Sequence, residues 1–111
     1  MPIVRIVAVS KEGGHTYKNY RIVLVCHINQ NNRISEGEWF GCVKFESVSY
    51  PFVLQGGNRL FYGYEENTFE PTNIGSRTIV KGEYFTVSSA PNTNDESEGV
   101  YQITSVHQYD S

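Results

Sequence analysis

Three histidines and two cysteines are the side chains of this sequence that could bind a metal ion or act as a nucleophile. The histidines are scattered and form none of the short spacings, such as Cys-x-x-Cys or His-Glu-x-x-His, that hold a metal: His15, His27 and His107. A neighbouring imidazole can lower the pKa of a thiol, and Cys42 with His27 would be such a pair. Neither a third orienting residue nor an oxyanion hole is evident. We therefore predict no catalytic residue, no metal site and no cofactor.

The two cysteines fall in a predicted β-hairpin that joins residues 20–28 to residues 38–47. Directly opposed residues of a hairpin lie on the same side of the sheet. Matching the apolar faces of the two strands places Cys26 opposite Gly41 and points Cys42 to the other side. Two thiols on opposite faces cannot form a disulfide, so we expect both to be reduced.

Tyrosines are the second group that could serve a function. The chain contains eight, and a small core cannot satisfy that many hydroxyl groups. Exposed tyrosines anchor protein partners or stack on bases, although they can also cap the ends of a barrel. We predict a binding surface on strand 59–64 and the loop 65–76, because that loop is longer than a simple connection requires. The predicted binding residues are Arg59, Tyr62, Tyr64, Glu65, Glu66 and Phe69.

The elements that must position these residues are β-strands. Short β-branched and aromatic runs alternate with turn signals roughly every eight to twelve residues, as in sandwiches and barrels. The first strand is apolar on both faces, which indicates a central position or a barrel plugged by a loop. We predict an all-β fold, with one small antiparallel β-barrel or sandwich of seven or eight short strands.

Length and charge limit the classes of protein further. The 111 residues predict a single β domain over 1–111. A net charge of −3 argues against a protein that coats nucleic acid. Residues 1–34 nevertheless carry five bases and one acid, which predicts a basic patch unless the fold mixes the charges. No apolar run approaches the ~18 residues of a membrane span, and the start lacks the features of a secretory signal. We expect a cytoplasmic protein with no membrane contact.

The closing pattern, "IVKGEYFTV" followed by "GVYQITSV", resembles the terminal hairpin of many small barrels. These include the short head–tail connector proteins of tailed phages and Src-homology-like barrels. The resemblance covers residues 79–106. It implies a small barrel and carries over no functional residue.

The interpretation that follows is a non-catalytic binding or interaction module of a bacterial or phage cytosolic protein, with a protein as its partner. Three alternatives come from other classes. A phage structural or assembly subunit is favoured by the closing hairpin. A nucleic-acid-binding barrel is favoured by Arg59 among aromatics in "GGNRLFYGY". A small enzyme is the last. The identity of the partner and the oligomeric state are not predicted.

The opposite orientation of the cysteines leads to a first prediction. Alkylation of the denatured protein without reductant should label both Cys26 and Cys42, because neither is expected to be bonded. Mass spectrometry would detect the two adducts. A protein that takes up no label and is lighter by two hydrogens would contradict both the hairpin parity and the cytoplasmic assignment.

Overall fold

The computed structural model describes residues 2–12, 14–63, 69–88 and 98–109. These residues form eight strands and one short 3-10 helix. In chain order the elements are β1 (Ile3–Glu12), β2 (His15–His27), β3 (Glu38–Phe45), β4 (Val48–Gln55), β5 (Arg59–Phe61), β6 (Phe69–Pro71), η1 (Ile74–Ser76), β7 (Tyr84–Ser88) and β8 (Glu98–Tyr109).

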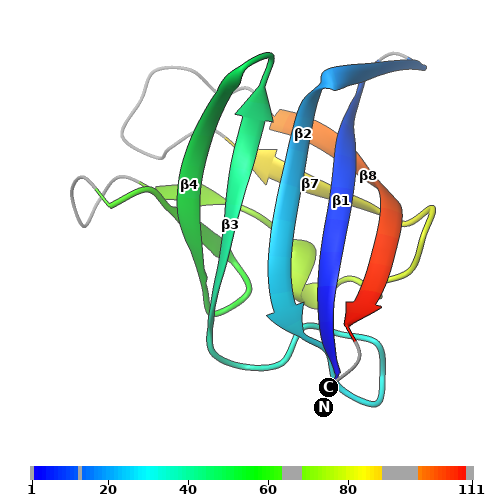
Figure 1. Ribbon diagram of the computed structural model, residues 1–111, viewed down its shortest axis with the longest axis vertical. Helices are drawn as coiled ribbons and strands as arrows, with labels where there is room; N and C mark the ends of the chain where they lie inside the picture. The colour runs from blue at the N-terminus through cyan, green and yellow to red at the C-terminus, as the bar shows by residue number, and fades with distance from the viewer. Residues whose placement is uncertain (1, 13, 64–68, 89–97, 110–111) are drawn as a thin grey trace.

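The strands form one antiparallel sheet in the order β6-β5-β4-β3-β2-β1-β8-β7. The sheet curls until its two edges meet, with β7 lying behind β2 and β1 (Figure 1). An isolated bridge between Thr72 and Val87 joins these edges. The fold is therefore all-β, as predicted, and of the two predicted architectures it is an almost closed barrel.

The interior of the barrel is filled by alternate residues of the strands. Along β1, Val4, Ile6 and Ala8 are at most 1% exposed, and they pair with inward residues of β2. This period of two follows from the pleat of a strand. The core that results also includes Ile22, Leu24, Cys26, Phe52, Leu54, Leu60, Ile74, Ile79, Phe85 and Ile103.

The register between β2 and β3 corrects the prediction by two residues. Gly41 pairs with Leu24, whereas matching of apolar faces had placed it opposite Cys26. A Cβ atom at Gly41 would lie 2.3 Å from the Val23 carbonyl oxygen and 2.8 Å from Cζ of Phe52. β3 thus approaches β2 so closely that only glycine fits, and the Phe52 ring occupies the space beside it. Hydrophobic matching cannot detect such a steric requirement.

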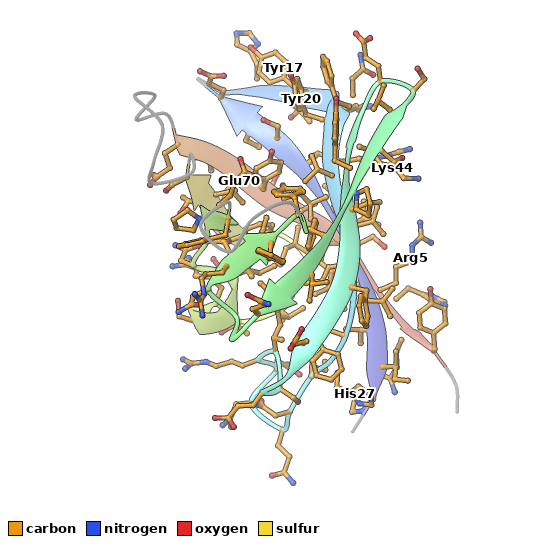
Figure 2. The ribbon with its side chains drawn as sticks, turned by 90° about the vertical axis from the view of Figure 1, so that its left-hand side faces the viewer. Arg5, Tyr17, Tyr20, His27, Lys44 and Glu70 are labelled. Carbon is orange, nitrogen blue, oxygen red and sulfur yellow. The ribbon has the colours of Figure 1, made fainter. Side chains whose placement is uncertain are left out.

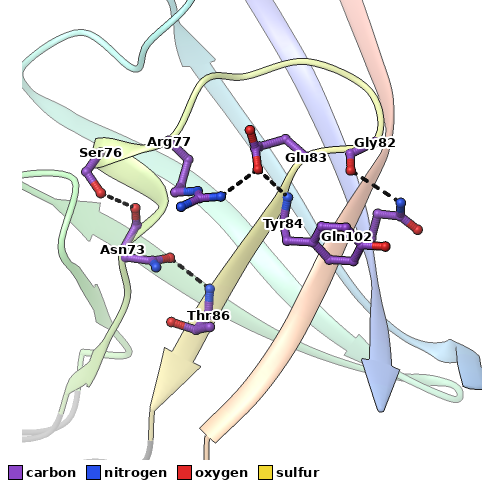
Figure 3. Close-up of polar contacts among 8 residues, drawn as sticks. All are labelled: Asn73, Ser76, Arg77, Gly82, Glu83, Tyr84, Thr86 and Gln102. Carbon is purple, nitrogen blue, oxygen red and sulfur yellow. Dashed lines mark hydrogen bonds and ion pairs between the residues drawn. The ribbon is translucent and has the colours of Figure 1, made fainter. Parts of the chain in front are cut away.

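The barrel closes through polar contacts that follow the short β6 (Figure 3). The Thr72 hydroxyl donates to the Thr86 carbonyl over 2.7 Å. The Thr86 N–H donates to Oδ1 of Asn73 over 2.8 Å, and the Asn73 N–H returns a bond to the Thr86 carbonyl. The bridge between Thr72 and Val87 is the one ladder pair here among the described residues, and these side-chain and backbone hydrogen bonds complete the seam of the barrel.

An ion pair braces the segment that leads into β7 (Figure 3). Nη2 of Arg77 lies 2.6 Å from Oε1 of Glu83, and the same oxygen accepts the Tyr84 N–H over 3.0 Å. On the far side of this segment, the Gln102 amide donates to the Gly82 carbonyl. These contacts tie the turn before β7 to η1 on one side and to β8 on the other.

The close approach at Gly41 makes its substitution costly. Gly41→Ala should destabilise the fold by roughly 1–3 kcal/mol, because an extra methyl group in a filled space forces strands apart. Denaturant unfolding would measure the change. Gly99→Ala is the matched control, since its nearest neighbour is a Tyr101 ring carbon at 3.3 Å. Equal stability of the two variants would show that the β2–β3 spacing does not depend on glycine.

The Glu83 carboxylate gives the fold a pH dependence. The hydrogen bond from the Tyr84 N–H, followed by that from Arg77, holds the pKa of Glu83 below its ordinary value of 4.5. A carboxylate with a lowered folded pKa stabilises the fold above its unfolded pKa, and this contribution is lost as pH falls through the folded pKa.

Glu83→Gln should therefore lower the urea midpoint at neutral pH, and the gap to the parent should narrow in acid below the folded pKa. Glu46→Gln is the control, because Glu46 is exposed in the β3–β4 turn. A gap for Glu83→Gln that stays constant over the whole pH range would refute the assignment.

Candidate functional site

The predicted binding residues on and around β5 do not form a single surface in the described structure. Arg59 is exposed, and its guanidinium carbon lies 5.3 Å from the centroid of the Phe69 ring. Tyr62 is half-buried and packs edge-to-face on Phe52. Its hydroxyl donates to Oε1 of Glu70 over 2.5 Å. The exposed Arg59 thus pairs with the half-buried Phe69, while Tyr62 packs against the core.

The other predicted binding residues, Tyr64, Glu65 and Glu66, lie outside the described residues. For Tyr62, burial and then the hydrogen bond to Glu70 raise the pKa of the hydroxyl above its ordinary value. Tyr62 therefore remains a neutral donor near neutral pH, and its contact with Glu70 is part of the packing.

The thiols and the imidazole considered for nucleophilic chemistry do not meet. Cys26 is buried, and burial raises its pKa to about 12, so it stays protonated and inert. Cys42 lies on the other face, opposite Val23. His27 lies on β2, four residues after Val23. The centroid of its ring is 5.0 Å from that of the Trp39 ring. Both cysteines are free, as predicted, but no Cys–His pair forms.

The outward side of β1–β4 is a more extensive surface. Two rows of cross-strand partners cover it, and their members are mainly apolar. The first row contains Arg5, Val25, Phe40 and Val53. The second contains Val7, Val23, Cys42 and Pro51. We call these eight residues, together with the neighbouring Arg21 and Lys44, the outer face.

Three apolar residues of the outer face are exposed, Val25, Phe40 and Pro51, and the other four are half-buried, Val7, Val23, Cys42 and Val53. Phe40 is 68% exposed and Val25 is 39% exposed. An antiparallel sheet with one face in water normally carries polar residues on that face. The first strand was predicted to be central or to lie in a plugged barrel, because it is apolar on both faces, and it does lie between β2 and β8. Its Ile3, at 40% exposure, extends the open apolar surface.

Three basic side chains lie on the outer face. Arg5 is paired with Val25 in the apolar rows, and Arg21 is directly opposite Lys44 at their border. Arg5 and Lys44 project to the same side of the sheet, to the right in Figure 2. Like charges that face each other across strands destabilise a sheet. The ion pair found among the described residues, Arg77–Glu83, involves none of these bases.

The outer face was not predicted, because the tyrosines and the length of the loop pointed to β5. Two signals in the sequence do indicate it. Strand parity puts Phe40 on the side opposite Trp39, and the excess of bases in residues 1–34 includes Arg5 and Arg21. The barrel could have dispersed that excess, but it brings both arginines onto the same wall as Lys44.

Other kinds of site receive no support in the described part of the chain. No three His, Cys, Asp or Glu side chains there come together as a metal site would require. No helix among those residues has the length and hydrophobicity needed to cross a membrane. Comparison with family models, curated proteins and solved structures found no match to this chain.

Proposed function

We propose that this chain is a non-catalytic binding module that docks through its outer face onto another protein. The observation that carries this proposal is the exposed apolar wall around Phe40. Contiguous apolar surface rimmed by polar groups is typical of interaction sites. A phenylalanine projecting from a rigid sheet can fill a pocket at little cost in conformational entropy, as hot-spot residues do.

The basic residues define the chemistry of the partner. Arg5, Arg21 and Lys44 have no carboxylate partner in the described chain, and the acids of β1 and β3 lie at strand ends, at Glu12 and Glu38. Carboxylates on a partner would relieve the repulsion between Arg21 and Lys44. The partner surface we infer therefore has an apolar centre and acidic residues around it.

Two other occupants of the outer face are disfavoured: a second copy of this chain and nucleic acid. A second copy docked by this face would bring the same bases against each other. Nucleic acid is disfavoured because single-stranded binding surfaces offer several rings for stacking, whereas the centre of the outer face is mainly aliphatic. The net charge of −3 further weakens attraction to phosphates.

A displayed library of random peptides is a suitable probe, since the selection itself identifies the sequences that bind. Peptides selected on the parent should combine apolar with acidic residues. Phe40→Thr, which preserves β propensity, should weaken their binding by about 30-fold or more, the loss expected at a hot spot. Tyr84→Thr removes an exposed ring elsewhere and should leave binding unchanged.

Charge reversal tests whether acidic residues on the partner contact the bases of the outer face. The double variant Arg21→Glu/Lys44→Glu should slow association and reduce its dependence on salt, whereas Lys18→Glu/Lys81→Glu makes the same change in net charge at other exposed sites. Circular dichroism would verify folding of each variant. Selected peptides that bind Phe40→Thr as tightly as the parent would refute the outer face as the site. Dimerisation abolished by Phe40→Thr, or steeply salt-dependent binding of a single-stranded oligonucleotide, would identify a second copy or nucleic acid instead.

A further inference from the structure

A second, separate feature lies at the end of the barrel where the hairpins extend past the core. There the inward positions of β2 and β3 are aromatic, and Tyr20 pairs with Phe45. Tyr17 and Tyr20 lie together at this end, opposite the end that carries His27 (Figure 2). A cavity of about 340 Å³ opens beside them. We call it the barrel mouth; its lining residues are Ser10, Glu12, Tyr17, Tyr20 and Tyr101.

Two of the three tyrosine rings are held in place by other rings. Tyr20 stacks on Phe45 with a centroid distance of 4.0 Å and an interplanar angle of 25°. Tyr101 stacks on the buried Phe85, at 5.7 Å and 15°. A ligand that binds between them therefore does not have to order these side chains, which removes part of the usual cost of binding.

The barrel mouth is also acidic. Glu12 lines it directly. Burial raises the pKa of the Tyr101 hydroxyl, and the charge of Glu70 adds to this shift. No lysine or arginine is among the described residues that line the cavity. Lys11 instead lines a neighbouring cavity, to which Ser10 and Glu12 also contribute.

We propose that the barrel mouth binds a methylated ammonium group. Tyrosine faces attract cations, and sets of aromatic rings recognise quaternary ammonium ions because such ions give up little hydration. A carboxylate at the edge of the rings adds charge complementarity. An anion would be repelled by Glu12, and a neutral group of the same shape would gain no cation–π attraction. The site is separate from the outer face and does not depend on it.

Tetramethylammonium chloride is the probe, and tert-butanol is its neutral counterpart of similar shape. Titration of the ¹⁵N-labelled chain, at constant ionic strength, should give saturable shifts at Tyr17, Tyr20 and Tyr101 with the cation only. Amides of the outer face, such as that of Phe40, should not move. Choline and a peptide containing trimethyllysine would then show whether a free metabolite-sized ligand or a protein side chain binds more tightly.

Two variants at the exposed Tyr17 distinguish ring from hydroxyl without disturbing the core. Tyr17→Leu should weaken binding of the cation about 2- to 10-fold, and Tyr17→Phe should retain it, because a ring face is what the cation requires. Glu12→Gln should weaken it about 2- to 5-fold. Tyr109→Leu, at an exposed position at the far end of β8, is the control. Equal shifts with tert-butanol, or no saturation with tetramethylammonium at millimolar concentrations, would overturn the proposal.

Discussion

The close contact of β3 with β2 at Gly41 sets the arrangement on which both sides of the barrel wall depend. The backbone of β2 and the ring of Phe52 leave no room for a side chain there. This contact selects the pairing of Gly41 with Leu24. Once that pair is fixed, every other residue of β3 follows by alternation. Trp39 and Val43 then pack against the core, while Phe40 and Lys44 point outward.

A single wall thus has two apolar sides with different environments. The inner side is covered by the rest of the barrel, and it supplies the hydrophobic stabilisation of the fold. The outer side has valines, Phe40 and Cys42 but no covering element among the described residues. Residues of this kind are not needed on the outside of a sheet to form it. These residues, together with bases that have no carboxylate partner in the described part of the chain, distinguish the outer face from an ordinary solvated wall.

The general class of the fold could be predicted because it depends on local signals. β-branched runs, alternation and regularly spaced turns are present along the printed sequence, and they indicated an antiparallel all-β fold of about the observed number of strands. Face parity also survived: Cys26 and Cys42 lie on opposite sides although their register was wrong by two residues. A shift by two leaves parity unchanged, so parity is easier to predict than pairing.

The site was harder to predict because it depends on contacts between distant segments. Tyr62 was expected on the surface, yet its hydroxyl donates a hydrogen bond to Glu70 on the neighbouring β6. Arg21 and Lys44 become neighbours only through the β2–β3 register. The barrel mouth likewise combines Tyr17 and Tyr20 with Tyr101 from the far end of the chain. Alternation along one strand contains no information about which strand lies next to it.

The seam beside β6 has a consequence for the way the barrel could fail. If β6 and β7 part, the curled sheet becomes an open one with two free edges, and free edges recruit strands from other chains. One of these edges is only three residues long and ends at Pro71, which has no N–H group to offer to an incoming strand. An opened barrel would therefore present a poor template for polymerisation on the β6 side. The junction between β6 and β7, where the sheet is held by the fewest backbone pairs, thus exposes an edge that recruits other strands poorly when it opens.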